Sequence, residues 1–508
     1  MNPTKPLKSF SLFLNLLLIS TFFVFASSPS SNAIVKAQPE LIQIASGNPG
    51  QLVSVIVQKV DKATIVEEQV TRSGGQVTQD LKIINAFAAE MTSQAALEIA
   101  RSSHVRWVSL DAAVVSSACT ACIDTTNLAN AYIRTIKADQ LWNKSPYIQG
   151  KAIGVAVIDS GINPNGDLFT VMGVNRQVAD IRFNSDYNQT TTDGYGHGTH
   201  VSGIIAGDGS ESGGKYIGVA PMANIINVKV SNDDGSAMMK DIVAGLQWVL
   251  DHKATYNIRV VNLSLNSTVA ESYQTSPLDA AVEILWFNKI VVVVSAGNQG
   301  SGAIYPPAND PFVITVGATD DKGTASLSDD VMASFSAYGQ TSDGFKKPDL
   351  VAPGTNIVAR LVNQNIGLAN AHPTNKVSDQ YFRMSGTSMA APMVSGAVAL
   401  LLQDEPNLTP DQVKYRLTAT ANRSWTGYSS SKSGSGYLDV YAAVTGTSTQ
   451  NANTGLKASS LLSTGSTPIT WGSVGWNSVG WNSVGWNSVG WNSVGWNSVG
   501  WNSDYWDR

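Results

Sequence analysis

Charged residues are scarce in this chain, and the charge that is present is slightly acidic. Asp, Glu, Lys and Arg make up 14% of the 508 residues, and the formal net charge is -5. A protein that binds nucleic acid through its phosphates needs a basic field of clustered Lys and Arg. The composition offers no such field, so we expect no nucleic-acid partner.

Cysteine is almost absent. Cys119 and Cys122 form a single C-x-x-C pair, a spacing that in a cytosolic protein indicates redox chemistry or half of a zinc site. The second pair that would complete a zinc site is missing, and the export argued below favours oxidation. We therefore interpret the pair as a local disulfide or as two inert thiols, outside any catalytic group.

Long apolar runs are also lacking, apart from one at the N-terminus. Residues 10–26 are mostly apolar, follow Lys5 and Lys8, and lead to a small-residue site at Ala33. This order is typical of a secretory signal peptide, and the run is short for a membrane span. We predict a signal peptide at 1–33 and a secreted protein; a retained membrane anchor is the alternative.

Hydrophobic periodicity divides the following residues into two folded regions. In 48–112, strand-like and helical stretches follow the order β-α-β-β-α-β, which predicts a small α+β, ferredoxin-like sandwich. After a small-residue linker at 113–127, apolar strands alternate with helices over 128–446. That alternation predicts an α/β three-layer sandwich with a mostly parallel central sheet, whose active groups gather where the strands end.

The C-terminal part is repetitive. After a Ser/Thr/Gly-rich linker at 447–470, the unit W-N-S-V-G recurs through 471–508. A five-residue period fits neither a helix nor a strand, and an ordinary disordered tail is poor in aromatics. Regular Trp residues favour stacking, so the tail is a candidate for binding a cell surface, a polysaccharide or copies of itself.

A candidate nucleophile lies in "RMSGTSMAAPMVSGAVALLL", residues 383–402. Thr387 and Ser388 are typical of a helix start, and Pro392 is expected near the first turn of the apolar helix that follows. A capped core helix would explain this start but not why every residue around Ser388 is small. Small neighbours admit a substrate, and a helix N-terminus offers N–H groups to a developing anion, which favours Ser388 as a nucleophile.

Three further segments supply the groups that an activated Ser needs. Asp159 ends the strand-like "AIGVAVID", His197 stands between two glycines in "GYGHGTHVSG", and Asn298 follows the strand in "VVVVSAGN". Each alone suits a turn, core or metal-binding role; together they provide an orienter, a base and an oxyanion donor. The chain order Asp, His, Ser differs from that of α/β-hydrolases and of chymotrypsin-like enzymes.

Several motifs resemble, in order, those of the subtilisin-like serine proteases, the subtilases. They are "VAVIDSGI", "HGTHVSGIIAG", "VNLSLNS", "SAGN", "KPDLVAPG" and "SGTSMAAPMVSGAVALL", spread over 128–446. The resemblance implies a serine endopeptidase in which Asp159 orients His197, His197 acts as base and then acid, and Ser388 forms the acyl-enzyme. It further implies that Asn298 holds the oxyanion and that catalysis needs no cofactor.

The resemblance also implies how a peptide is bound. Subtilases pair an extended peptide as an added strand between two edges, which here match "SNDDGSA" and the segment at Ser264. Ala237 and Asn266 replace glycines of many relatives, so we expect slightly crowded edges. Ile304 is expected near the floor of the first specificity pocket, which favours medium apolar residues before the scissile bond within a broad specificity. The expected substrate-binding residues are Gly235, Ser264, Leu265, Asn266, Ser295, Ala296 and Gly297.

By pattern and position, 48–112 is similar to the subtilase propeptide, which assists folding and then inhibits the enzyme. We expect self-cleavage within 113–127 and a severed unit that stays bound as an inhibitor. Relatives often hold structural calcium, and Asp208 and Glu211 lie in a suitable loop. Their spacing defines no calcium site, so no metal ligand is assigned.

Two other functions fit parts of the sequence. One is a surface protein whose inactive protease domain displays the Trp-rich tail; the presence of all four catalytic groups counts against it. The other is an esterase, but "GTSMA" lacks the G-x-S-x-G elbow of that class.

Overall fold

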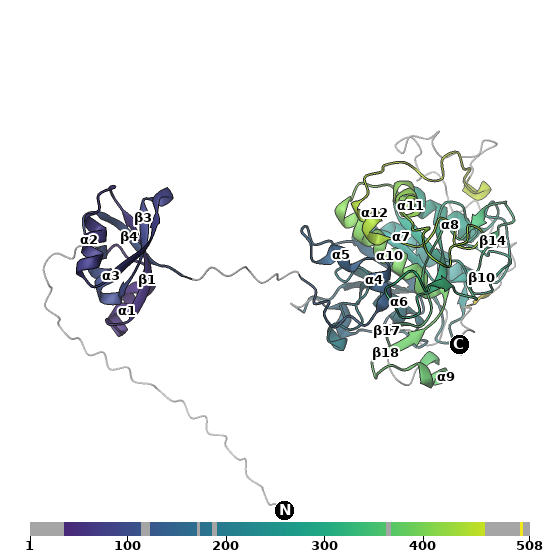
Figure 1. Ribbon diagram of the computed structural model, residues 1–508. Helices are drawn as coiled ribbons and strands as arrows, with labels where there is room; N and C mark the ends of the chain where they lie inside the picture. Colours follow the sequence, from purple (N-terminus) through teal and green to yellow (C-terminus); the bar gives the residue numbers. More distant parts are fainter. Residues whose placement is uncertain are drawn as a thin grey trace, which may run out of the picture. The chain divides into compact units, whose positions relative to one another are not determined.

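The structure, a computed structural model, describes residues 35–112, 122–169, 173–184, 190–361, 367–462 and the backbone of 498–500. The chain forms two compact units, 1–118 and 119–508 (Figure 1). The predicted signal peptide, most of the linker 113–127 and nearly all of the repeat tail lie outside the described residues.

The smaller unit contains a four-stranded antiparallel sheet in the order β2-β3-β1-β4. From β1 onward its elements follow the predicted order β-α-β-β-α-β. Val55 and Val57 alternate along β1 and join a core that also contains Phe87. Helix α1 lies before residue 48, but it buries Leu41 in the same core, so the unit begins earlier than the sequence predicts. The elements are α1 (Pro39–Gly47), β1 (Leu52–Lys59), α2 (Ile65–Arg72), β2 (Gln76–Leu81), β3 (Ala86–Thr92), α3 (Ser93–Ala100) and β4 (Val105–Leu110).

The larger unit is built on an eight-stranded sheet in the order β13-β12-β11-β9-β5-β7-β6, with β16 also paired to β12. All neighbouring strands are parallel except β13. Every residue of β5 is buried, as expected of a parallel strand covered on both faces. The strands are β5 (Gly154–Asp159), β6 (Gln177–Arg182), β7 (Asn224–Lys229), β9 (Ile258–Leu263), β11 (Val291–Ser295), β12 (Ile314–Asp320), β13 (Val331–Met332) and β16 (Leu350–Pro353).

Helices cover both faces of this sheet, which confirms the predicted three layers. Ser395 of α10 donates to Asn262 of β9, whereas Gly245 of α7 lies against Val228 of β7. Val228 and Leu263 both pair with Ile158 of β5, so their side chains point to the same face of the sheet. Asn262 precedes Leu263, and successive side chains of a strand point to opposite faces, so Asn262 points to the other face. Therefore α10 and its neighbour α6 cover one face, and α7 and its neighbour α8 cover the other. The helices are α4 (Ala131–Thr135), α5 (Asp139–Trp142), α6 (His197–Ala206), α7 (Met239–His252), α8 (Pro277–Phe287), α9 (Gly367–Ala371), α10 (Thr387–Asp404), α11 (Pro410–Ala419) and α12 (Val440–Thr445).

Short strands complete the larger unit, and β8 (Ala237–Met238) directly precedes α7. One local expectation needs correction. Pro392 lies inside α10 and not in its first turn. A three-stranded sheet joins β8 to β10 (Asn266–Ser267) through β19 (Ser498–Gly500). The other two small sheets pair β14 (Gly339–Gln340) with β15 (Lys346–Lys347), and β17 (Ile357–Arg360) with β18 (Tyr381–Met384).

Within the described part of the chain, no helix is long and apolar enough to cross a membrane.

Three buried carboxyl groups lie where α8 contacts the end of the domain. Burial raises the pKa of Asp279 and Glu283 well above their usual values and that of Asp310 to about 6. The Ser459 N–H donates to Glu283 Oε2 at 2.7 Å. Because the folded state holds these protons more tightly than the unfolded state, the three groups favour folding below about pH 4. Each group loses that contribution as the pH rises through its own raised pKa, which is about 6 for Asp310.

We predict that Glu283→Gln flattens this pH dependence. The amide keeps an oxygen for the Ser459 N–H but cannot ionise, so the melting temperature should fall less between pH 4 and 8 than it does in the parent. Calorimetry in a Ser388→Ala background avoids autolysis, and the exposed Asp379→Asn serves as the matched control. Parallel melting curves for Glu283→Gln and its parent would contradict the prediction.

Candidate active site

The end of β5 and the start of α6 bring together the first two predicted residues. Asp159 is the last residue of β5, and His197 is the first residue of α6. His197 Nδ1 lies 2.9 Å from Asp159 Oδ1 and 3.0 Å from Oδ2, and both side chains are buried. An Nδ1–H donated to the carboxylate places the accepting lone pair of the ring on Nε2, the arrangement that a general base requires.

Asp193, which the sequence analysis did not single out, holds the start of α6. Its Oδ1 accepts from the Ser160 hydroxyl at 2.8 Å and from the Gly196 N–H at 2.6 Å, and its Oδ2 accepts from the Thr199 N–H at 2.8 Å. Burial raises the pKa of this carboxyl. The signal for it was an Asp just before the start of α6, because such residues satisfy unpaired N–H groups at a helix start.

Glycine at 198 is required by the approach of β5 to α6. A Cβ on Gly198 would lie 2.2 Å from the Gly161 carbonyl oxygen and 3.0 Å from Asp159 Oδ1. The Gly198 N–H donates to Ser160 Oγ at 2.9 Å. This glycine therefore lets backbone and the Asp159 carboxylate pack against the helix start.

His200, the second histidine of the "HGTH" segment, forms hydrogen bonds between α6 and neighbouring strands. It is fully buried, and its Nε2 donates toward the carbonyls of Ile357 at 3.2 Å and Phe382 at 3.0 Å. Burial lowers its pKa to about 3, so the ring is neutral at physiological pH. The side chain ties α6 to the β17–β18 pair.

Ser388, the second residue of α10, is locked to the segment after β9. Pro392 has no N–H, so the Ser388 carbonyl lacks the donor that the i+4 residue of a helix would supply. Ser264 Oγ donates to that carbonyl at 3.0 Å, and Ser388 Oγ donates to the Ser264 carbonyl at 3.1 Å. Asn262 Nδ2 in turn donates to Ser264 Oγ at 3.0 Å. These bonds fix the candidate nucleophile against the predicted peptide-binding segment at Ser264.

Asn298 lies beside the same helix start. Its Oδ1 accepts from the Thr387 N–H and hydroxyl, each at 2.9 Å. A Cβ on Gly386 would lie 3.3 Å from Asn298 Nδ2, which places the amide nitrogen next to the first turn of α10. Because α6 and α10 pack together, the four predicted residues belong to one region at the ends of β5, β9 and β11.

The remaining predicted binding residues line the edges of this region. Gly235 has φ +85° in the turn before β8, a conformation that favours glycine. The buried Asn266 side chain donates to the Ser295 carbonyl at 2.9 Å, so it packs against the end of β11. Leu265, Ala296 and Ile304 are buried, and the Gly297 N–H donates to Thr387 Oγ1 at 3.1 Å.

Other sequence candidates lie elsewhere. Asp208 Oδ1 accepts from the Ser210 N–H at 2.9 Å, and the Glu211 carboxylate pairs with Arg360. The described residues contain no group of three or more His, Cys, Asp or Glu that could hold a metal ion. Cys122 is disulfide-bonded, while Cys119 lies outside the described residues.

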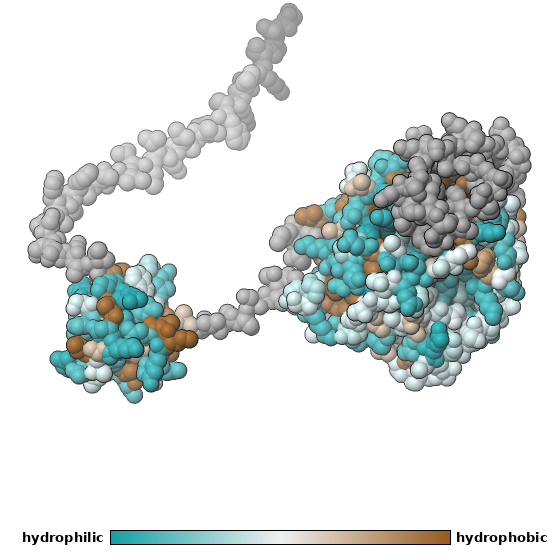
Figure 2. Space-filling model, turned by 90° about the horizontal axis from the view of Figure 1, so that it is seen from above, coloured by the Kyte–Doolittle hydropathy of each residue, from teal (hydrophilic) through white to brown (hydrophobic). Residues whose placement is uncertain are grey.

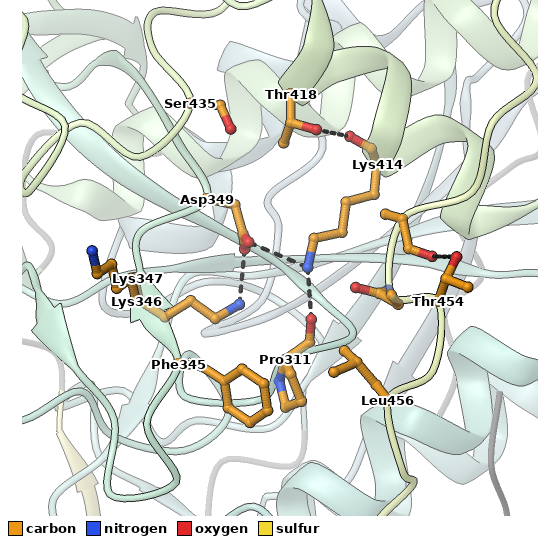
Figure 3. Close-up of a pocket in the computed structure, with 12 residues that line it drawn as sticks. Pro311, Phe345, Lys346, Lys347, Asp349, Lys414, Thr418, Ser435, Thr454 and Leu456 are labelled. Atoms are coloured by element: carbon orange, nitrogen blue, oxygen red, sulfur yellow. Dashed lines mark hydrogen bonds and ion pairs between the residues drawn. The ribbon is translucent and has the colours of Figure 1, made fainter.

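A pocket of about 400 Å³ is separate from these residues and is structural in character (Figure 3). Asp349 of the "KPDLVAPG" motif faces Lys347 Nζ at 2.8 Å and Lys414 Nζ at 3.2 Å. Burial lowers the pKa of Lys414 to about 8, and its ammonium also donates to the Pro311 carbonyl at 2.7 Å. The motif thus holds α11 to the end of the sheet.

Comparison with known proteins agrees with this geometry. Residues 150–451 match the model of the Subtilase family. The chain is 38% identical over 373 residues to serine protease AprX of Bacillus subtilis strain 168, covering 72% of this chain and 80% of that protein. It is 30% identical over 386 residues to subtilisin NAT of Bacillus subtilis subsp. natto, covering 74% and 85%. Over 301 residues it is 33% identical to subtilisin Savinase of Lederbergia lenta, covering 58% and 92%. The predicted fold and peptidase class are thereby confirmed: the chain belongs to the subtilase family and is a subtilisin-like serine peptidase.

Proposed function

We propose that this peptidase is a secreted serine endopeptidase that acts through Asp159, His197 and Ser388. The observation that carries the proposal is the buried Asp159–His197 hydrogen bond of 2.9 Å beside the helix start that bears Ser388. In the proposed reaction, His197 Nε2 takes the proton of Ser388 Oγ as that oxygen attacks the peptide carbonyl. His197 then donates the proton to the leaving amine, and water, activated by the same ring, hydrolyses the acyl-enzyme.

Two donors are proposed for the oxyanion of each tetrahedral intermediate. They are the backbone N–H of Ser388 at the start of α10 and the Nδ2 group of Asn298, whose Oδ1 is held by Thr387. Asp159 keeps the ring of His197 in the productive tautomer and stabilises the imidazolium. His197 carries the proton, Asp159 stabilises the imidazolium, and the two donors stabilise the oxyanion, so the proposed mechanism uses no metal or organic cofactor. Structural calcium stays unassigned.

We expect Asn298→Ala to lower kcat by about 10²–10³, the effect that loss of one oxyanion donor has in subtilisins, with little change in KM. Steady-state hydrolysis of a chromogenic peptide measures both constants. A rise in KM with unchanged kcat would show that Asn298 shapes the binding site instead. A near-normal kcat would remove it from the oxyanion site.

We further propose that residues 1–33 direct secretion and that the small unit, which comprises the predicted 48–112 and the preceding α1, is an inhibitory propeptide. The small unit has its own core yet exposes large apolar side chains, among them Leu52 at 75%, Ile83 at 97% and Trp107 at 42% (Figure 2). Docking on the peptidase would remove exposed apolar side chains of this kind from water. The unit is joined to the peptidase by the small-residue linker 113–127.

Expression of Ser388→Ala is expected to yield a signal-cleaved but otherwise unprocessed precursor, because the first bond cut is the protein's own. Wild type should yield a shorter chain that begins within 113–127, and Asp379→Asn should match wild type. Mass spectrometry of the secreted products identifies the N-termini. If Ser388→Ala acquires the wild-type N-terminus in a host without other proteases, self-cleavage is excluded.

Substrate preference is proposed to be broad, with a medium apolar residue before the scissile bond. The wall formed by Ser295, Ala296 and Gly297 is built of small residues, and the buried Ile304 is proposed to shorten the pocket. Ile304→Ala should raise kcat/KM for Phe relative to Leu by at least about tenfold in a peptide library, because a single methylene group in an apolar pocket changes discrimination by about 10–200-fold. A wild-type profile that favours Trp or Glu would contradict this proposal.

A further inference from the structure

The C-terminal repeat meets the peptidase at the two edges expected to bind substrate. The backbone of β19, the last S-V-G triplet of the repeat, lies between β8 and β10 and is antiparallel to both. Gly500 pairs with Asn266 and Val499 with Ser267 on one side. Ser498 pairs with Met238 and Val499 with Ala237 on the other.

Pairing of this kind depends on backbone groups. An extended segment between two edges exchanges N–H and C=O bonds on both sides, so its recognition tolerates many side chains. The edge strands β8 and β10 have only two residues each, and a peptide substrate would require the same N–H and C=O groups. Substrate and β19 therefore exclude each other.

The occupied edge leads directly to the candidate nucleophile. Asn266 lies two residues after Ser264, whose carbonyl accepts from Ser388 Oγ at 3.1 Å. In an antiparallel pair, the partner strand runs in the opposite direction. If residue n of a bound peptide lies opposite Asn266, residue n+2 therefore lies opposite Ser264. The segment at β19 thus runs in the direction that carries a bound chain toward Ser388.

Chain connectivity permits this contact. The Ser460 N–H donates to the Gln274 carbonyl at 3.1 Å, which anchors the linker before the tail to a residue only seven positions after Ser267. Seven residues span at most about 25 Å, whereas the contour length of 463–497 is roughly 120 Å. The tail also contains six copies of S-V-G, each able to offer the same backbone.

We propose that the W-N-S-V-G repeats are an intramolecular ligand of the β8 and β10 edges, which competes with substrate and holds the enzyme partly self-inhibited. The proposal rests on the proposed function, since it takes these edges as the substrate site. Linkage to the same chain gives the tail an effective concentration in the millimolar range, enough for a weak peptide strand to compete.

The test compares the processed wild-type enzyme with a chain ending at Thr470 and with two full-length repeat variants. In one variant every valine of the six S-V-G triplets, including Val499, is changed to proline, which removes the N–H needed for pairing. In the matched control each is changed to threonine, which keeps the N–H. Chain length and every Trp are the same in both full-length variants.

We expect the KM for a short peptide substrate to fall about three- to tenfold in the truncated and proline chains, with kcat unchanged. The threonine chain should behave as wild type. Hydrogen–deuterium exchange should show that 235–238 and 264–267 lose protection in the same two chains. Equal KM values and equal protection in all four chains would overturn the proposal. The proposal would also be overturned if the only effect of truncation were the loss of binding to a polysaccharide or cell surface.

Failure of the proposed function gives a different result. A fluorophosphonate that labels Ser388 in all four chains establishes the nucleophile independently of the tail. If no chain is labelled, the proposed catalytic roles fail, while the exchange measurement still decides whether the repeat occupies the edges.

Discussion

Burial of the Asp159 carboxylate is the constraint on which the rest of the site depends. An unsatisfied polar group in a protein interior costs about 1–3 kcal/mol, and a charged one costs more. The donors here are the Ser160 N–H at 2.7 Å and the ring of His197 at 2.9 Å. The ring can reach the carboxylate only if the start of α6 lies against the end of β5. Gly198 allows that approach, and Asp193 supplies the hydrogen bonds that the first turn would otherwise lack.

A second unpaired group explains how α10 is placed. A proline inside a helix removes one hydrogen bond and costs about 3 kcal/mol or more in an ordinary interior position. At Pro392 the freed acceptor is the carbonyl of Ser388, and the Ser264 hydroxyl replaces the missing donor. The hydrogen bond that replaces the missing helical one therefore joins α10 to the segment that follows β9. The reciprocal bond from Ser388 Oγ places nucleophile and peptide edge within one local network.

The two edge strands β8 and β10 are the proposed binding site of more than one peptide segment. The proposed occupants are a substrate and the C-terminal repeat, and both need the same short strands β8 and β10. On these proposals, removal of the propeptide would not leave the edges empty, because the tail is attached at high effective concentration. Activity would then depend on how well a substrate strand competes with six equivalent triplets. Backbone pairing makes this possible without any match in side chains.

Local rules in the sequence predicted the element types and indicated the candidate residues of the site. Apolar periodicity predicted β5 and the small β-α-β-β-α-β unit, and the motifs around Asp159, His197, Asn298 and Ser388 indicated the catalytic groups. Such signals work because caps, strand burial and helix starts involve residues a few positions apart. Only the tertiary structure decided that Asp193 holds α6, that Pro392 lies within α10 and that Ser264 satisfies the carbonyl that it frees. The order of the parallel strands and the insertion of β19 between β8 and β10 were likewise decided by contacts between distant segments. Hydrogen-bond partners of buried groups and strand neighbours are set by which remote surfaces pack together, and no spacing along the chain records that choice.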